Sequence, residues 1–530
     1  MKNVDTRMLD HLGLVAGCYD EYGVAGIIDE VLPKKRVHRI GHGVTVKAMI
    51  LNGLGFVDRP LYMTPEFFSK VPCERLLGGG VSPEYLNDDA LGKTLDCISE
   101  YGPTELFNEI ILNGVMKKLG LRTHLLHLDT TSFSLYGEYP EEGEADIKIN
   151  LGLPKDGRWD LKRFVVGLAC NHHGMPLFMK AFSGNHSDRK SLMEMVESLK
   201  RGLSSKDKVY HVADSAFYTK ENLQGVGVST FWISRVPNTI KEAAQLLGSD
   251  VELKPCKDQR YSYYETLSDY AGVPQKWILV NSKEMQKTMT GTFERKLSVE
   301  LDATEKSFVH LRNQEFFCGE DALKAAHKWI LDHPLVKFEA VSTEAFRKKN
   351  GRGRPRKNEP VQEFYRIKAT IKTNQEEVTR RRERLGRFII ATNDVERDGE
   401  SLLTDYKDQG IVERGFRFLK DDTFRVSNVY LKKPERIEAL AMIMVLCLLI
   451  YSILEWKLRE KLKSSGKTVR SQTKKRIQNP TMKWVFYLFL GVAEVHVNIE
   501  NHSLTEITHI TDDLRTILDL LGEPYKKYYD

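Results

Sequence analysis

The spacing of apolar residues predicts helices over residues 1–120. The clearest case is Pro103–Leu119, where one face repeats an apolar side chain every four residues: Phe107, Ile111, Val115 and Leu119. Pro103 suits a first helical turn, and Gly120 suits a helix end. The preceding pattern, Asp88–Tyr101, fits half of a helix-turn-helix or plain bundle packing, and bundle packing is the commoner arrangement.

Between residues 121 and 236 the apolar period becomes that of β-strands. A turn at Asn171–Gly174 joins two strand patterns as a hairpin, and a helix pattern at Ser187–Leu203 separates the third strand from the fourth. Antiparallel strands, a helix and a returning strand make a compact α/β layer. The strand candidates are Thr123–Ser132, Arg163–Cys170, Met175–Phe182, Val209–Ala213 and Thr230–Val236.

A long segment, 237–385, interrupts this layer. It contains a polar helical stretch at Lys283–Leu331 and strand patterns at Arg260–Thr266, Lys276–Val280 and Glu363–Lys372. The buried-strand pattern of Gly386–Thr392 rejoins the layer, and helical patterns follow from Leu402 onward. We therefore predict five regions: a helical N-terminal domain (1–120), a first core part (121–236), an insertion (237–385), a second core part (386–456) and a C-terminal helical region (457–530).

Composition excludes several classes of protein. Hydrophobic residues make up 41% of the 530 residues, which is enough for a packed core and excludes wholesale disorder. The seven scattered cysteines contain no CxxC pair, which argues against a disulfide scaffold and a structural zinc site. The first ten residues have no apolar signal-peptide core, and the run Ala439–Leu454 is shorter than the roughly twenty residues of a membrane span. We expect a cytoplasmic protein with no membrane partner.

Three acidic residues stand where carboxylates are costly. Asp129 lies within an apolar strand pattern, and Asp214 ends another. If the third segment is helical, its polar residues form a stripe at steps of three or four: Tyr406, Gln409, Glu413, Arg417 and Lys420. Singly, each Asp is more simply explained by a strand-end turn or an ion pair. Together, in this strand order, the three carboxylates suit two Mg²⁺ ions about 4 Å apart that stabilise the nucleophile and leaving group of phosphoryl transfer.

The arrangement resembles the DDE transposases of bacterial insertion sequences, which use a ribonuclease-H-like fold. The matching motifs are His-Leu-Asp129-Thr-Thr-Ser and Val-Ala-Asp214-Ser-Ala-Phe-Tyr. The third is the family signature Tyr-x2-Arg-x3-Glu-x6-Lys, which Tyr406, Glu413 and Lys420 match while Gln409 replaces the arginine. The resemblance implies an α/β protein with a ribonuclease-H-like catalytic core interrupted by a large insertion domain. Residues 1–120 are similar to an uncharacterised domain that often precedes such a core.

The resemblance also implies roles for these residues. Asp129, Asp214 and Glu413 would be catalytic and would hold two Mg²⁺ ions, with Mn²⁺ as a substitute. Because Gln409 carries no charge, a nearby arginine would replace the phosphate contact of the family's arginine. The DNA contacts near the cut would come from Tyr406, Gln409, Arg414, Arg417 and Lys420.

Further candidates lie in the insertion. The Arg-Gly-Arg-Pro tract resembles an AT-hook, in which Arg352, Arg354 and Arg356 would follow a narrow A·T minor groove, although a solvated linker is an equally good interpretation. The run Arg380–Arg387 is a second basic element that could face phosphate. The family insertion can stack a displaced base on an aromatic ring, and the candidates here are Trp277 and Trp329.

These features favour a DNA transposase that cleaves the ends of an insertion sequence and joins them to target DNA. Its partners would be double-stranded DNA, namely the terminal inverted repeats and the target, and a second copy in a synaptic homodimer. It would be cytoplasmic and associate with the bacterial nucleoid when bound to DNA. Two alternatives stay open: a catalytically inactive or domesticated DNA-binding protein, and a ribonuclease-H-like nuclease without strand transfer.

Overall fold

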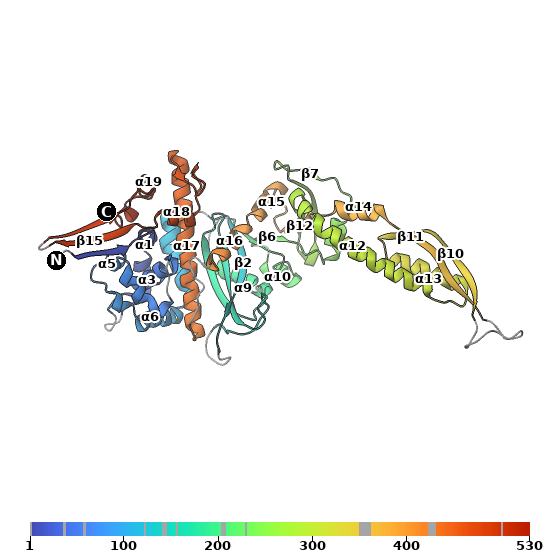
Figure 1. Ribbon diagram of the computed structural model, residues 1–530, viewed down its shortest axis with the longest axis horizontal. Coiled ribbons are helices and arrows are strands. Elements are labelled where there is room, and N and C mark those ends of the chain that lie inside the picture. The colour runs from blue at the N-terminus through green and yellow to red at the C-terminus, as the bar shows by residue number, and fades with distance from the viewer. Residues whose placement is uncertain are drawn as a thin grey trace. The chain divides into compact units, whose positions relative to one another are not determined.

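Two compact units make up the computed structural model (Figure 1). Unit 1 contains Met1–Arg235, Ser268–Gln275 and Thr392–Asp530, and unit 2 contains Val236–Leu267 and Lys276–Ala391. Helices and strands mix along the chain, so the predicted α/β class is confirmed at that level. The structure describes every residue except 1–2, 35–38, 57–59, 121–122, 140–145, 155–156, 203–207, 228–229, 349–361, 422–430 and 500–501.

The N-terminal part of unit 1 is a packed set of helices. The predicted helix over Pro103–Leu119 is confirmed, although its middle, Ile110–Met116, has the wider π-helical turn, and it ends at Gly120 with φ 59°. Asn87 caps the preceding helix, because its side chain accepts a hydrogen bond from the Ala90 N–H. The helices are α1 (Leu12–Glu21), α2 (Val24–Val31), α3 (His42–Leu54), α4 (Thr64–Lys70), α5 (Cys73–Leu77), α6 (Asp88–Tyr101), α7 (Pro103–Glu109) and α8 (Lys117–Leu119).

A sheet follows these helices in unit 1, with its strands in the order β4-β3-β2-β5-β6. β2, β3 and β4 are antiparallel neighbours, whereas β5 and β6 run parallel to β2. The five predicted strands are confirmed to within a few residues: β2 (Leu125–Leu135), β3 (Lys162–Cys170), β4 (Pro176–Ser183), β5 (Tyr210–Ala213) and β6 (Phe231–Arg235). The crossovers carry α9 (Asp188–Gly202) and α10 (Lys220–Val226).

A long apolar helix, α17 (Pro434–Ser465), joins the two layers of unit 1. It packs against α1, α3 and α6 and also against β4. The helix is long and apolar enough to cross a membrane, but 94% of its most apolar window is buried inside the protein. It is therefore a core helix of unit 1. The neighbouring helices are α15 (Gly399–Lys407), α16 (Gly410–Leu419), α18 (Met482–Leu488), α19 (Asp512–Leu521) and α20 (Glu523–Lys526).

A three-stranded sheet in the order β1-β15-β16 projects from unit 1 (Figure 1). It joins β1 (Asn3–Met8) to β15 (Ala493–Ile499) and β16 (His502–Thr508). The predicted C-terminal helical region therefore contains strands beside its helices, and β1 precedes the N-terminal helices. In β15, Val495 and Val497 alternate with polar residues, which is the period of a strand. A short hairpin of β13 (Val469–Arg470) and β14 (Arg476–Ile477) follows α17.

Unit 2 combines a small sheet with two helices and a long hairpin. The predicted stretch Lys283–Leu331 is two helices, α12 (Lys283–Asn313) and α13 (Gly319–Asp332), which pack on the hairpin of β10 (Val336–Lys348) and β11 (Gln362–Thr373). The sequence interpretation missed β10 because its charged and apolar residues follow no regular period. The remaining elements are β7 (Lys254–Pro255), β8 (Tyr261–Ser268), β9 (Gln275–Ser282), β12 (Arg387–Thr392), α11 (Lys241–Leu247) and α14 (Gln375–Glu383).

Candidate active site

Two of the predicted carboxylates are neighbours across the sheet of unit 1. β2 and β5 pair in parallel, with His127 opposite Val212. Continuing this register by two residues sets Asp129 opposite Asp214, and such residues project from the same face of strands about 4.8 Å apart. One carboxylate oxygen of Asp129 accepts a hydrogen bond from the Thr130 N–H at 2.7 Å, and one of Asp214 accepts from the Ala216 N–H at 2.9 Å. The two half-buried acids are thus held in defined positions.

Arg235 extends this row across the third parallel strand. β5 and β6 pair with Ala213 opposite Ser234, so the next pair in register is Asp214 and Arg235. The Ser234 hydroxyl also donates a hydrogen bond to the Asp214 carbonyl at 2.8 Å. The sequence analysis missed Arg235, although the signal was present: an arginine ends a strand pattern at the position equivalent to Asp214.

The helix that bears Glu413 is anchored on β2 by Gln409. The predicted single helix is two, α15 and α16, which meet at Asp408 and Gln409. The Gln409 amide donates a hydrogen bond to the Leu128 carbonyl at 2.8 Å, and its oxygen lies 3.4 Å from His127 Nδ1. Gln409 therefore links the start of α16 to the residues just before Asp129.

The other end of α16 also reaches β2. The Lys420 ammonium lies 5.3 Å from the centre of the Phe133 ring. A helix in contact with His127 and Leu128 at one end and Phe133 at the other runs along the strand. Glu413 is one turn beyond Gln409, which places it over the stretch that contains Asp129, and its side chain is exposed.

The pKa of Tyr406 depends on the charged residues around it. Burial raises the pKa of its hydroxyl to about 12; the nearby positive charge of Arg235 opposes this rise, and the negative charges of Asp214 and Glu413 add to it. Tyr406 is therefore close to a residue from the sheet and to one from α16. It also keeps its proton at neutral pH and can donate a hydrogen bond.

The donor set has the chemistry of a magnesium site. Carboxylate oxygens are the hard ligands that Mg²⁺ prefers, and Asp129, Asp214 and Glu413 supply only such oxygens. Among the described residues, however, no three His, Cys, Asp or Glu side chains lie close enough together to hold a metal. The paired aspartates and the exposed glutamate thus fit the ion in donor type, although the three are not gathered into one ligand set.

His127, on the same face of β2 as Asp129, stays neutral. Burial lowers its pKa to about 4, an effect that the Gln409 contact opposes and the nearby His172 strengthens. The His127 ring therefore adds no positive charge beside Asp129. The ring instead serves as a contact for Gln409.

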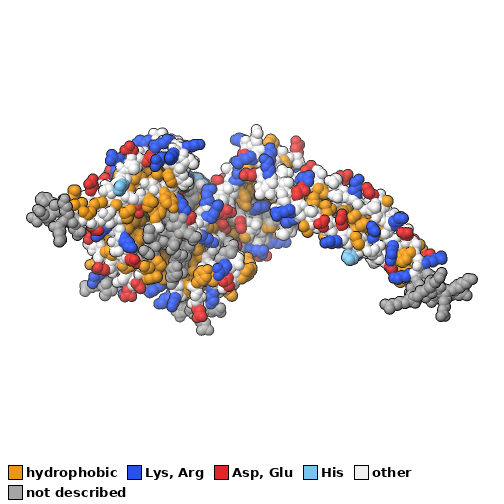
Figure 2. Space-filling view, in the orientation of Figure 1, with side chains coloured by type: hydrophobic (Ala, Val, Ile, Leu, Met, Phe, Trp, Pro, Cys, Tyr) orange, Lys and Arg blue, Asp and Glu red, His pale blue; other side chains and the backbone are white. Residues whose placement is uncertain are grey.

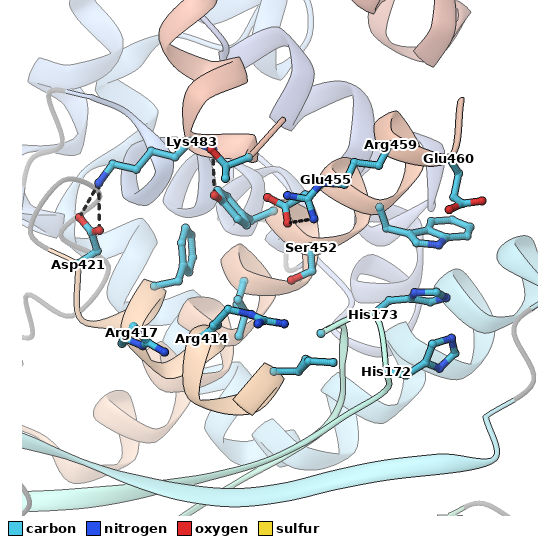
Figure 3. A pocket seen from close by; sticks show the side chains of 18 residues that line it. His172, His173, Arg414, Arg417, Asp421, Ser452, Glu455, Arg459, Glu460 and Lys483 are labelled. Carbon is cyan, nitrogen blue, oxygen red and sulfur yellow. Dashed lines mark hydrogen bonds and ion pairs between the residues drawn. The ribbon is translucent and has the colours of Figure 1, made fainter. Parts of the chain in front are cut away.

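A pocket of about 730 Å³ lies on another face of α16, between this helix and α17 (Figure 3). Arg414 and Arg417 extend from α16 into it, and His172 and His173 of the β3–β4 turn form another wall. Its other charged groups are partly paired: Lys483 with Asp421 at 3.0 Å, and Arg459 with Glu455 at 2.8 Å. Arg414 and Arg417 therefore line this pocket, whereas Gln409 and Lys420 contact β2.

The predicted basic run of unit 2 is used within that unit. Arg381 pairs with Glu300 at 3.2 Å, Arg382 pairs with Glu294 at 2.7 Å, and Arg387 donates to the Ser249 carbonyl at 2.9 Å. On the face shown in Figure 2, Lys and Arg side chains occur in small groups separated by acidic and apolar ones. The interpretation of Arg380–Arg387 as a phosphate-facing patch is therefore not supported.

The other candidates from the insertion divide into two groups. Trp277 and Trp329 are buried, and Trp329 packs in the core of unit 2 with its indole N–H bonded to Ser307 at 2.9 Å. Both rings fill the core, so neither presents a face on which a base could stack. The AT-hook-like residues lie outside the described residues: Arg352, Arg354 and Arg356.

Two family models match this chain. A family model described as a transposase DDE domain matches residues 128–450, a range that includes Asp129, Asp214 and Glu413. A second model, described as a domain of unknown function (DUF4277), matches residues 4–112. No curated protein matches the chain closely enough to add a relative. Because the first match covers more than half of the sequence, the chain belongs to the DDE transposase family.

Proposed function

We propose that this transposase cleaves the ends of an insertion sequence and joins them to target DNA, with Asp129, Asp214 and Glu413 as ligands of two Mg²⁺ ions. The observation that carries the proposal is the strand register that sets Asp129 beside Asp214, under a helix that Gln409 anchors on β2. Bound Mg²⁺ would activate the attacking oxygen and stabilise the leaving oxygen.

The remaining side chains of the site would bind and orient the DNA. Arg235 is a fixed positive charge beside Asp214, and Lys420 carries a second one over β2. Both would attract the phosphates that flank the cut. Tyr406 would donate its hydroxyl hydrogen to a phosphate oxygen, since its raised pKa keeps it protonated. Gln409 would act as a positioning residue for Glu413 in place of the direct phosphate contact expected from the family signature.

The architecture supports the same proposal at a larger scale. Three antiparallel strands followed by two parallel ones, in the order β4-β3-β2-β5-β6, are what a ribonuclease-H-like core requires. We assign this core to residues 121–236 and 386–456 and the insertion to residues 237–385. The helical region before residue 120 would bind the element ends, and two copies would hold the two ends together.

Replacing Asp129 by Asn tests the proposed chemistry. Cleavage of DNA that carries the element ends should fall at least about a hundredfold. A hundredfold is the largest effect expected when the group removed only orients a metal ligand, and Asp129 would be a ligand itself. Binding of the same DNA should change little. Asp188→Asn is the matched control: this acid bonds the Thr130 hydroxyl at 2.6 Å, on the opposite face of β2, and should leave cleavage largely intact.

The measurements are cleavage in gels and DNA binding by fluorescence anisotropy, both with and without Mg²⁺. If the Asp129 and Asp188 variants lost cleavage equally, the assignment of Asp129 and Asp214 as catalytic would be wrong. Strand transfer needs its own readout, because a nuclease would cut without forming joined products. A non-catalytic DNA-binding protein would bind the ends and show no metal-dependent nicking.

A further inference from the structure

The three-stranded sheet β1-β15-β16 is built with its apolar face outward. Val4 is 58% exposed, Met8 is 40% exposed and Leu504 is 62% exposed, and the registers place all three on one face. On the other face, Glu494 is only 5% exposed and pairs with Arg75 of α5. A sheet in contact with water normally turns its apolar face to the core. The reversed arrangement is typical of a surface that meets a partner.

The outer edge of β1 has the geometry for adding another strand. β1 is an end strand of the sheet, and its register with β15 is continuous. The Leu9 N–H donates to the Val492 carbonyl at 2.9 Å, so odd-numbered residues of β1 form the hydrogen-bonded pairs with β15. The backbone groups of Val4, Thr6 and Met8 therefore face the free edge.

The side chains of β1 are self-complementary about Thr6. If a second β1 lies antiparallel with Thr6 opposite Thr6, Asp5 of each strand faces Arg7 of the other, and Val4 faces Met8. The outward backbone groups then form the hydrogen-bonded pairs, and Asp5 and Arg7 occupy the closer, non-hydrogen-bonded pairs. If two β16 strands paired in the same way about Thr505, apolar Leu504 of each would face charged Glu506 of the other. Complementarity thus selects β1 over β16.

We propose that two copies of this chain associate through antiparallel pairing of their β1 strands about Thr6. The contact is isologous, so it closes as a dimer with two-fold symmetry. It would join two sheets into one of six strands and cover Val4 and Met8 with each other. This inference gives a surface for the dimer proposed above, but the pairing needs no DNA, metal or intact acidic site.

A charge exchange on the full-length protein tests the pairing. Sedimentation velocity without DNA should show that the wild type associates. Either single variant, Asp5→Arg or Arg7→Asp, should weaken association about tenfold, because each brings two pairs of like charges face to face. The double variant Asp5→Arg, Arg7→Asp should restore it. A mixture of the two single variants should form a heterodimer, since each then faces its opposite charge.

A cross-link provides a second readout. Thr6→Cys should give a disulfide-linked dimer under mild oxidation, because residues paired across the axis have Cα atoms about 5.5 Å apart. Thr505→Cys, at the centre of the other edge strand, should stay monomeric in the same assay. Leu504→Lys should leave association unchanged. If this variant associated more weakly, the two copies would instead meet through the apolar faces of their sheets. A monomeric wild type, or single variants that neither weaken association nor complement each other, would overturn the proposal.

Discussion

At the scale of single residues, the sequence identifies the acids but not what positions them. Asp129 and Asp214 are visible in sequence because carboxylates are rare in apolar strands. Gln409 looks like a departure from a motif, and only the structure shows its hydrogen bond to the Leu128 carbonyl. Arg235 and His127 both lie in predicted strands, but their neighbours at the site come from other strands or helices, so their roles could not be assigned from the sequence.

Gln409 should control the metal affinity of the site. Gln409→Ala removes a hydrogen bond worth about 1 kcal/mol and loosens α16 over β2. We expect the Mg²⁺ concentration for half-maximal cleavage to rise roughly tenfold, as for other groups that orient a metal ligand. Gln409→Arg keeps a donor for Leu128 and should largely preserve the affinity. A drop in stability with an unchanged Mg²⁺ requirement would leave Gln409 a purely structural role.

His11 should make unit 1 less stable in acid. Its ring is buried, bonds the Leu54 carbonyl at 2.7 Å and stacks on Phe486. Burial lowers its pKa to about 4, an effect that the hydrogen bond to Leu54 opposes. The unfolded chain takes up this proton near pH 6.5 and the folded chain only near pH 4. The free energy of unfolding is therefore highest above pH 6.5 and falls as the pH drops toward 4, by at most about 1.4 kcal/mol per pH unit.

His11→Phe removes this proton uptake. The melting temperature of the variant should fall less between pH 7 and pH 5 than that of the wild type, as measured by calorimetry. His327→Phe, at an exposed position, is the control. Its melting temperature should depend on pH as that of the wild type does. An identical pH dependence in all three proteins would contradict the role assigned to His11.

At the scale of helices and strands, prediction succeeded where one face of an element is buried. The strands of 121–236 alternate or are continuously apolar, so their bounds follow from local pattern. Charged residues lie along β10 without a regular period, and β15 pairs with β1 from a distant part of the sequence. Neither situation leaves a strong local signal, because the stabilising contacts come from distant segments.

The packing of α2 on α3 depends on one glycine. A methyl group on Gly43 of α3 would lie 2.6 Å from the Ala25 Cα of α2, which is closer than atoms can approach. Gly43→Ala should therefore lower stability by about 1–3 kcal/mol, as for other overpacked cores. Gly26→Ala, in α2, has open space around the added atom and should be neutral or stabilising by up to about 1 kcal/mol. Thermal unfolding of the two variants compares them directly.

At the scale of the whole molecule, composition says little about the partner. The net charge of +6 is small, and the basic run Arg380–Arg387 is matched by acids and carbonyls. The class of fold and the transposase family were both predictable because motifs spaced along the chain converge on one sheet. Unit 2 lies close to the predicted insertion, 237–385, but the return of Ser268–Gln275 to unit 1 has no signal in the local sequence.

DNA binding should depend steeply on salt. A protein that neutralises several phosphates releases counterions, so the logarithm of its affinity falls linearly with that of the salt concentration. Between 50 and 200 mM salt we expect a loss of about 10³-fold, measured by anisotropy on DNA with the element ends. Lys420→Ala should reduce the slope by about one unit, and Lys324→Ala, a surface control in unit 2, should not. A flat response would exclude the phosphate contacts assigned here.

The pairing of β1 with β15 also constrains how the protein is made. β1 and β15 lie far apart in the sequence, so β1 gains its hydrogen-bonded neighbour only after β15 has been translated. Lys47 and Asp20 likewise wait for Tyr528, whose hydroxyl they both contact. Unit 1 therefore completes its packing only when segments far apart in the sequence have come together. A message truncated before β15 would yield a chain whose first strand never finds its partner.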